Sequence, residues 1–449
     1  MKQTRREFLR TVPAMALAGS GLLLPMGRGI AEADNIIGST PKKWYRGSLH
    51  MHTYRSDGAA FPEEAAALYK RLGYHFVALT DHNSTHEDPN RWIKTGQKKL
   101  TEKLVARFRD QFDFPLEKKV IDGIESFRLR TFAEMEELLN EPDRFLMISG
   151  NEVSSGSKNG EQLHAGFLNT RQGNKVVPTA TGYDNLLWTL KLRDELLGAD
   201  NRDTMYIVNH PLWRFYDVNP LDLAKQTSIR FFEVANVDAR PLFPSTAEFW
   251  THDKFWDVVN AFRCKNGGPL LYGIGSDDTH NYDMFYGKPD YVGYVMVHSS
   301  VLSIPALFEA MYRGDFYTST GLELADVSFD PVRRMLRVKV QPRPGEKYTI
   351  QFIGTKKGFD EKPKKTFVYK AQGEIPEWAL RQNYLLPTRQ MNVWSEEIGR
   401  VFKTVEGPEA SYTLESDDLY VRAKIVTDKG IQPEQEHPST PLAWTQPVR

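Results

Sequence analysis

The sequence predicts an α/β protein, in which a parallel sheet or barrel is followed by a small antiparallel β-sandwich-like domain. A helix-like run at 61–73 leads directly into an apolar run at 75–80, and such a β-α-β unit with short connections is typical of parallel sheets. Apolar runs then recur, several of them alternating with helical stretches. After about residue 325, apolar and polar residues alternate in short runs between Pro and Gly turns, which favours antiparallel strands.

The elements are expected in the following order along the chain. The 61–73 helix is indicated by proline in its first turn and glycine at its end. Residues 84–144 are polar, and we interpret them as an insertion on the rim with helices near 98–109 and 132–139. Further strands are expected at 145–149, 164–168, 205–208, 230–235, 270–274 and 292–297, with helices at 183–197 and 249–263. The barrel is assigned to 34–324 and the β-rich domain to 325–449, with strands at 327–330, 335–340, 348–353 and 419–426.

Composition excludes several classes of protein. The chain has 449 residues, 40% hydrophobic and 26% charged, which is ordinary for a globular protein long enough for two domains. Lys plus Arg and Asp plus Glu both number 58, so no net field attracts nucleic acid, and no nucleic-acid partner is expected. The single cysteine, Cys264, excludes an internal disulfide.

The N-terminus is interpreted as an export signal. Arg5 and Arg6 belong to a twin-arginine motif, which precedes a modest apolar segment at 11–24 that is interrupted by proline and glycine. Small residues place a cleavage site after Ala33, so residues 1–33 are predicted to be removed. We therefore expect engagement of the twin-arginine export machinery, a periplasmic or otherwise exported mature chain, and no stable membrane anchor. An uncleaved anchor is the alternative.

A first cluster of metal-type side chains lies at the end of the first expected strand. His50 and His52, at i and i+2, point to the same side of an extended strand and can share one metal ion. Asp57 adds an oxygen ligand on a turn closed by Gly58, which is expected to relieve the backbone strain of bringing the carboxylate back toward the histidines. Taken alone, this stretch is also compatible with an ordinary strand and turn.

Further metal-type residues follow at the ends of later strands. These are His82, Glu152, His164, His210, Asp278 and His280. In a parallel α/β barrel such strand ends meet on one face, where the functional site lies. One such residue is usually a satisfied hydrogen-bonding group, but clusters in succession predict a metal site. Nitrogen and oxygen ligands without a thiolate suit Zn, Mn or Fe.

The ordered motifs resemble those of the polymerase and histidinol phosphatase (PHP) superfamily. The motifs are His-x-His-Thr-x-x-Ser-Asp-Gly, Thr-Asp-His-Asn, Gly-Asn-Glu, Asn-His-Pro and Ser-Asp-Asp-Thr-His, and the likeness covers roughly 44–320. Within that superfamily, the exported chain, the stretch at 316–321, the β-rich tail and the closing Trp444-Thr445-Gln446-Pro447 are similar to the CehA/McbA-like branch.

The resemblance implies a distorted (β/α)7 barrel with two or three divalent ions. By position, one ion would be held by His50, His52, Glu152 and Asp278. A second ion would be held by Glu152 together with His164 and His210, and a third by Asp57, His82 and His280. Asp278 is chosen over Asp277 because it keeps the i, i+2 spacing to His280. Asp81 is expected to support a ligand rather than to bind metal. His75 is expected in the core, and His86, His252 and His298 in surface or packing roles.

The implied activity is metal-dependent hydrolysis of a small, anionic substrate. Two ions bridged by Glu152 would lower the pKa of a shared water and generate a hydroxide that attacks a phosphate monoester or diester. Glu152, His210 and His280 are the expected catalytic residues, and Arg214 and Arg240 are candidates for binding a substrate anion. One alternative is hydrolysis of a carboxyl ester, amide or carbamate, and another is a noncatalytic metal- or carbohydrate-binding protein.

Overall fold

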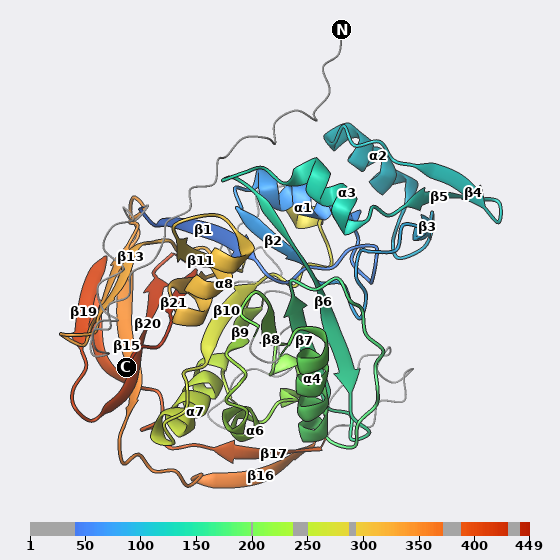
Figure 1. Ribbon diagram of the computed structural model, residues 1–449. Coiled ribbons are helices and arrows are strands. Elements are labelled where there is room, and N and C mark those ends of the chain that lie inside the picture. Colours follow the sequence, from blue (N-terminus) through green and yellow to red (C-terminus); the bar gives the residue numbers. More distant parts are fainter. Residues whose placement is uncertain (1–40, 199–200, 237–249, 287–292, 371–387, 430–440) are drawn as a thin grey trace, which may run out of the picture. The chain divides into compact units, whose positions relative to one another are not determined.

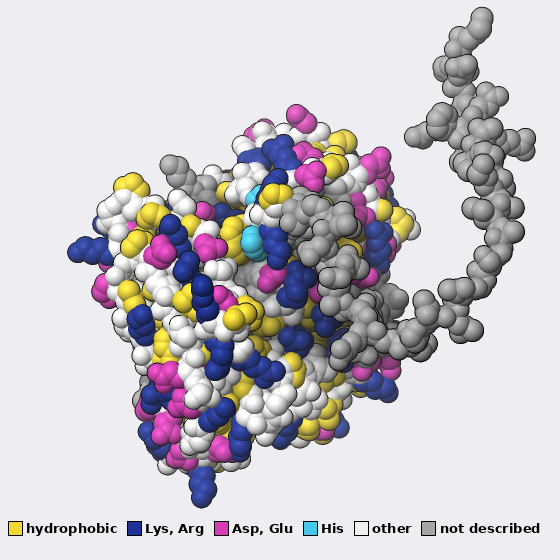
Figure 2. All heavy atoms as spheres, turned by 60° about the vertical axis from the view of Figure 1, so that its left-hand side comes forward, with side chains coloured by type: hydrophobic (Ala, Val, Ile, Leu, Met, Phe, Trp, Pro, Cys, Tyr) yellow, Lys and Arg dark blue, Asp and Glu magenta, His cyan; other side chains and the backbone are white. Residues whose placement is uncertain are grey.

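The structure is a computed structural model that describes residues 41–198, 201–236, 250–286, 293–370, 388–429 and 441–449 (Figure 1). The predicted signal at 1–33 lies outside the described residues. In the part of the chain that is described, no helix is both long and apolar enough to cross a membrane. Figure 2 shows basic and acidic side chains mixed over one face, as the equal numbers of the two charges suggest.

The N-terminal strands are the centre of a large mixed sheet. Strand β1 (Lys43–Ser48) is parallel to β2 (Phe76–Leu79), which is parallel to β6 (Leu146–Gly156). Strand β7 (Gln162–Leu168) runs antiparallel to both β6 and β8 (Met205–Asn209). The prediction that these strands are all parallel is therefore wrong at β7. Because β7 is reversed, its beginning lies beside the carboxyl ends of its neighbours.

Two more parallel strands complete this side of the sheet. Strand β9 (Phe231–Asn236) pairs with β8, and β10 (Tyr272–Ser276) pairs with β9. The sheet order begins at β10 and does not return to it, so strand pairing among the described residues does not close a barrel. Beyond the strand ends, an isolated parallel bridge between Met51 and Thr279 joins the segments that follow β1 and β10.

The helix after β1 forms where the sequence predicts it. In α1 (Pro62–Arg71) proline occupies the first turn, Glu63 and Glu64 lie near the positive end of the helix dipole, and Lys70 and Arg71 lie near the negative end. The later helices that alternate with strands are α4 (Gly182–Leu196), α5 (Trp213–Tyr216), α6 (Pro220–Lys225), α7 (His252–Lys265), the 3₁₀ turn η1 (Asp283–Tyr286) and α8 (Ile304–Arg313).

The insertion at 84–144 contains a small sheet that the sequence analysis missed. Its elements are β3 (Trp92–Lys94), α2 (Glu102–Gln111), β4 (Lys118–Ile121), β5 (Ile124–Arg128) and α3 (Phe132–Leu139). Asp122 and Gly123, both at positive φ, form the tight turn between β4 and β5. An Asp-Gly pair is a strong hairpin signal, but the charged, exposed β4 hid the strands beside it.

Beyond β1, further strands pair antiparallel and extend the large sheet. They follow the order β11 (Tyr294–Ser299), β12 (Phe316–Ser319), β21 (Leu442–Thr445), β20 (Asp418–Thr427), β15 (Tyr348–Lys356) and β18 (Arg400–Glu406). Strands β13 (Leu324–Asp330), β14 (Met335–Val340) and β19 (Glu409–Thr413) form a separate sheet that shares a hydrophobic cluster with β15 and β20. The large sheet crosses residue 324, and the domain boundary there stays a prediction.

A two-stranded hairpin from the C-terminal part lies apart from these sheets. It consists of β16 (Lys365–Lys370) and β17 (Thr388–Val393), paired antiparallel in register from Lys365 with Val393 to Lys370 with Thr388. In Figure 1 the hairpin lies below α6 and α7. Met391 of β17 is fully buried in the main hydrophobic core, so this strand is anchored by apolar contact.

Candidate metal centre

The predicted ligands come together where the strand ends meet. Short backbone contacts arrange them: the amide of His52 donates to Thr279 O at 3.0 Å, and the amide of Asp278 donates to His50 O at 3.2 Å. A second isolated bridge joins His82 to Glu152. His164, near the start of β7, joins the cluster because that strand is antiparallel to its neighbours.

The Glu152 carboxylate lies at the middle of the cluster. It is fully buried, and its oxygens lie within 3.4 Å of nitrogens of five histidines: His50 (3.2 Å), His52 (3.4 Å), His82 (2.8 Å), His164 (3.3 Å) and His210 (3.2 Å). Burial alone would raise the pKa of Glu152, but the neighbouring histidines hold its pKa well below the usual range. The carboxylate is therefore ionised and able to contact more than one cation.

The side chains of the adjacent residues Asp277 and Asp278 point in different directions, and this shows which of them belongs to the cluster. Asp278 Oδ1 lies 3.1 Å from His50 Nε2 and 3.0 Å from His52 Nε2. Asp277 instead accepts hydrogen bonds from the Tyr69 hydroxyl at 2.8 Å and the Gly293 amide at 2.5 Å. Burial raises the pKa of Asp277 to about 7. Only Asp278 is placed among the predicted ligands.

Asp57 forms the more exposed side of the cluster. Its carboxylate lies 3.5 Å from His280 Nε2, 3.6 Å from His82 Nε2 and 3.7 Å from His52 Nδ1. Gly58 allows the chain to turn back toward the histidines, but not by the relief of backbone strain that the sequence suggested. A Cβ at Gly58 would lie 2.3 Å from the His52 carbonyl group, so the position requires the space that glycine leaves rather than an unusual φ.

The donor set fits divalent metal ions. Four groups of ligand atoms each lie within 4.8 Å of one another. They are His52 with Asp57, His82 and His280; His50 with His52 and Glu152; His50 with His210 and Asp278; and His82 with Glu152 and His164. Among the described residues, Glu152 Oε2, Asp278 Oδ1 and His164 Nδ1 are buried without a well-aligned hydrogen bond, and their near neighbours are other predicted ligands. Leaving such atoms unpaired is costly, and bound cations would satisfy them. How the ligands divide among ions stays a prediction.

Glu233, in the middle of β9, is a site residue that sequence reasoning missed. It is fully buried, and it accepts from His50 Nδ1 at 2.8 Å, from the His210 amide at 2.8 Å, from Asn236 Nδ2 at 2.8 Å and from the Ser276 hydroxyl. A carboxylate that holds the second nitrogen of a metal-type histidine fixes its orientation. The signal was an acidic residue inside the apolar run Phe231-Phe232-Glu233-Val234-Ala235.

The Asp81 side chain supports the Asp57 loop and, in the described part of the chain, makes no direct hydrogen bond to a predicted ligand, whereas the Asp81 carbonyl oxygen accepts from the Glu152 amide at 3.2 Å. It accepts from the amides and hydroxyls of Thr53 and Ser56 at distances from 2.5 to 2.9 Å. His86, expected in a surface or packing role, is buried, and its Nε2 lies 2.8 Å from Asp81 Oδ2. Lys98 of the insertion donates to the carbonyl groups of Tyr54 and Arg55 at 3.0 and 3.3 Å. The insertion thus helps to hold the metal-site loop.

The two candidate anion-binding arginines are not placed by the structure. Arg240 lies outside the described residues, and Arg214 lies in α5 with a side chain that is likewise outside the description. Beside it, the Trp213 ring packs 5.1 Å from the His164 ring and 5.3 Å from the His210 ring, measured between centroids. One wall of the cluster is therefore aromatic.

No protein-family model and no curated protein matches the chain. Among solved structures, the chain is similar to a two-domain protein from Bacteroides vulgatus containing a predicted PHP-like metal-dependent phosphoesterase, at 12% identity and a TM-score of 0.37, over 89% of this chain and 95% of that one. It is also similar to a candidate metal-dependent phosphoesterase from Bifidobacterium adolescentis, at 11% identity and a TM-score of 0.30, over 54% of this chain and 88% of that one.

A third similar structure is an amidohydrolase from Chromobacterium violaceum with bound sulfate and no metal. The identity is 14% and the TM-score 0.27, over 60% of this chain and 96% of that one. All three TM-scores lie below 0.5, so these likenesses assign no function to this chain.

Proposed function

We propose that the chain is a metal-dependent hydrolase of the PHP superfamily that cleaves a small phosphate monoester or diester. The observation that carries the proposal is the buried Glu152 carboxylate, which lies within 3.4 Å of five histidines. A site that only binds one ion does not need a carboxylate shared among several ligand groups, whereas a hydrolytic centre with adjacent ions does. The ordered sequence motifs support the superfamily assignment, and we further propose membership of the CehA/McbA-like branch, a likeness that also allows a carboxyl-type electrophile.

Divalent ions held by these residues would supply Lewis acidity and lower the pKa of a coordinated water. The chain's own residues hold the ligand atoms in place before substrate arrives: Glu233 orients His50, and Asp81 orders the loop that carries Asp57. Side chains of His82 and His280 are 24% exposed, and that of Asp57 is 56% exposed. This exposed side of the centre is where a substrate anion would approach, and His280 is the expected catalytic histidine there.

Hydrolysis of a carboxyl ester, amide or carbamate is the second candidate. The observation that favours it is Trp213, whose ring packs against both His164 and His210. An aromatic wall suits an apolar acyl or leaving group better than a phosphate, for which arginine is the more usual partner. The same metal centre would serve either electrophile.

We also propose that the protein acts outside the cytoplasm after twin-arginine export and removal of residues 1–33. Export in a folded state suits a centre whose ligands come from many separate segments between His50 and His280. A metal can then be loaded before translocation.

The deciding experiment measures metal content and hydrolysis in the purified mature protein. Substrates are p-nitrophenyl phosphate, bis-p-nitrophenyl phosphate and p-nitrophenyl acetate, tested with wild type, Glu152→Ala and the near-isosteric Glu152→Gln. The exposed Glu195 of α4 provides the control Glu195→Gln. Two or three ions per chain, with phosphate-ester turnover lost only in the Glu152 variants, is the expected result. A protein that binds metal but hydrolyses only p-nitrophenyl acetate would favour the second candidate. A chain that binds no metal would refute both candidates.

A further inference from the structure

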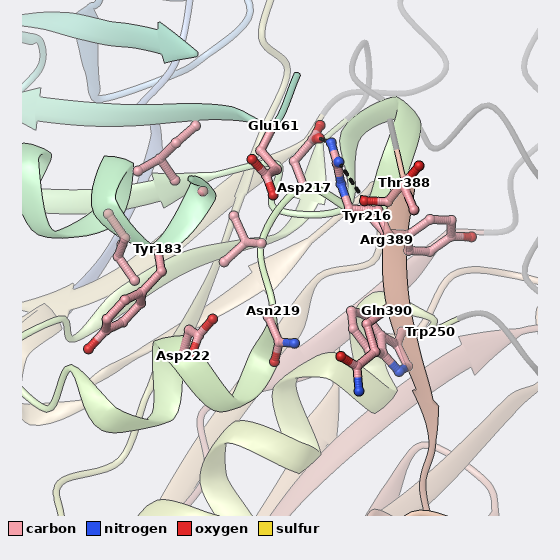
Figure 3. A pocket seen from close by; sticks show the side chains of 14 residues that line it. Glu161, Tyr183, Tyr216, Asp217, Asn219, Asp222, Trp250, Thr388, Arg389 and Gln390 are labelled. Carbon is pink, nitrogen blue, oxygen red and sulfur yellow. Dashed lines mark hydrogen bonds and ion pairs between the residues drawn. The ribbon is translucent and has the colours of Figure 1, made fainter. Parts of the chain in front are cut away.

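Arg389, in strand β17 of the C-terminal hairpin, connects two segments that are far apart in the sequence. Its Nη2 donates to Asp217 Oδ1 at 2.5 Å and to the carbonyl oxygen of Gly160 at 3.2 Å. Figure 3 shows Arg389 directed at Asp217, with Glu161 on the far side of that carboxylate. The side chains of Arg389 and Asp217 are only 7% and 3% exposed. One buried guanidinium therefore holds both segments.

The two segments carry two of the predicted metal ligands. Gly160 lies in the turn that precedes β7, four residues before His164. Asp217 ends the segment that begins at His210, and this segment is closed by the Val218 amide donating to Pro211 O at 3.1 Å. The rings of His164 and His210 lie 4.9 Å apart between centroids, with Trp213 packed against both. The separation of these histidines therefore depends on how the two segments are held.

The His210 segment needs such an external restraint. His210 has φ 24° and Tyr216 has φ 57°, so two non-glycine residues adopt the left-handed region. A non-glycine residue in this region is strained, and it persists only where surrounding contacts impose the conformation. Glu233 restrains the first through the His210 amide, and Arg389 restrains the residue directly after the second. The strained segment is thus fixed at both ends.

The hairpin has attachments other than Arg389. Met391 is fully buried in the main core, and Trp250 Nε1 donates to Asn392 O at 2.8 Å. Replacing Arg389 is therefore expected to free the two segments while leaving the hairpin in place. This separation makes the role of the arginine testable.

We propose that Arg389 is a positioning residue of the metal centre, which sets the distance between His164 and His210 through Gly160 and Asp217. The proposal rests on the metal centre of the proposed function and assigns the C-terminal hairpin a part in it. Among the described residues Arg389 contacts no predicted ligand, so its effect is on the affinity for the ion that His164 and His210 are predicted to share with Glu152. Loss of such outer contacts commonly weakens metal binding by about 10-fold or more.

The test titrates the metal-free mature protein with Co²⁺, followed by calorimetry and by the visible absorption of bound Co²⁺. The variants are Arg389→Met, Arg389→Lys, Asp217→Asn and the double variant Arg389→Met/Asp217→Asn. Arg337→Met, on an exposed position of β14, is the matched control. We expect Arg389→Met to weaken one class of Co²⁺ site about 10-fold, with the remaining sites and the control close to wild type. Arg389→Lys should restore part of the affinity, and the double variant should lose no more than Arg389→Met alone.

Each other outcome overturns the proposal in a distinguishable way. Wild-type Co²⁺ affinity in all Arg389 and Asp217 variants would refute the positioning role of Arg389 and leave the proposed function intact. Equal weakening of every site together with a lower melting temperature would show that Arg389 serves folding alone. A wild-type chain that binds no Co²⁺ would refute both the proposed function and the positioning role of Arg389.

Discussion

Glu233 Oε1 accepts a hydrogen bond from His50 Nδ1 at 2.8 Å, while Oε2 of the same carboxylate accepts from the His210 amide at 2.8 Å. The residue therefore orients one predicted ligand through its ring and another through its backbone. Burial alone would raise the pKa of Glu233, but His50 and His210 lower it, so the carboxylate is ionised. Its position inside β9 places it behind the metal centre rather than at the substrate side.

We expect Glu233→Gln to weaken metal binding by about 10-fold. The amide keeps the shape of the side chain but loses the charge that holds the Nδ1 proton of His50, so the ring is less firmly oriented. Equilibrium dialysis against Zn²⁺ or Mn²⁺ measures the affinity, and Asp222→Asn on the outer helix α6 is the matched control. Undiminished affinity in Glu233→Gln would contradict this role.

Asp278→Asn and Asp277→Asn are expected to have different effects. Asp278→Asn should lower metal stoichiometry or affinity, because Asp278 Oδ1 lies within 3.1 Å of both His50 and His52. Asp277→Asn should keep all metals, since its side chain bonds Tyr69 and Gly293 instead. Metal analysis of the two purified variants decides the matter, and loss of metal in Asp277→Asn alone would reverse the assignment.

The raised pKa of Asp277 also predicts that the stability of the fold depends on pH. Its pKa is raised to about 7 by burial, so the native state resists ionisation that the unfolded chain permits. The contribution to stability is complete below the unfolded pKa and is lost as the pH rises through about 7. Metal-free Asp277→Asn should therefore be more stable than wild type at pH 8 by about 1 kcal/mol or more, with a smaller difference at pH 5. Urea unfolding at both pH values measures this, and a gain that is equal at both would contradict it.

Metal binding is expected to release protons near neutral pH. Burial alone would lower the pKa values of His50 and His210, but nearby carboxylates, among them Glu152 and Asp278, raise them above the ordinary histidine value. In the metal-free protein these histidines stabilise the fold at low pH, and this contribution is lost as the pH rises through the raised values. A cation must displace the same protons, so its affinity should fall as the pH is lowered from 8 to 6. Calorimetry in buffers of different ionisation enthalpy counts the released protons; no release would contradict the prediction.

The export prediction is tested by the conservative pair Arg5→Lys and Arg6→Lys. Because the motif is read by a receptor that requires arginines, the double variant should leave the full-length precursor inside the cell, whereas wild type should appear outside the cytoplasm without residues 1–33. Fractionation with N-terminal sequencing of the mature chain gives the answer. Export of the double variant at wild-type level would exclude the twin-arginine route.

Several features of the site followed directly from residue types and spacing. His50 and His52 lie on one side of an extended segment, as an i, i+2 pair requires, and His82 and His210 follow strands whose apolar runs were visible in the sequence. Glu152 was expected just past a strand, but it lies within β6, which continues to Gly156. Glu233 was harder to find, because one acidic residue within an apolar strand has no spacing partner. The β3–β5 sheet was missed because its strands are short and mostly polar on the exposed side.

Residue types and local spacing identified the groups available for metal binding and placed most of them next to apolar strands, because strand periodicity and ligand chemistry are local properties. The packing of distant segments was needed to show that Asp278 and not Asp277 faces the histidines, that β7 is reversed so that His164 joins them, and that Glu233 and Arg389 hold the surrounding segments. Those outcomes depend on which strands pair and on which side chains meet across more than a hundred residues, as Gly160 and Asp217 do with Arg389. Such contacts have no signature in the local pattern, because their energy arises only once the distant segments are buried together.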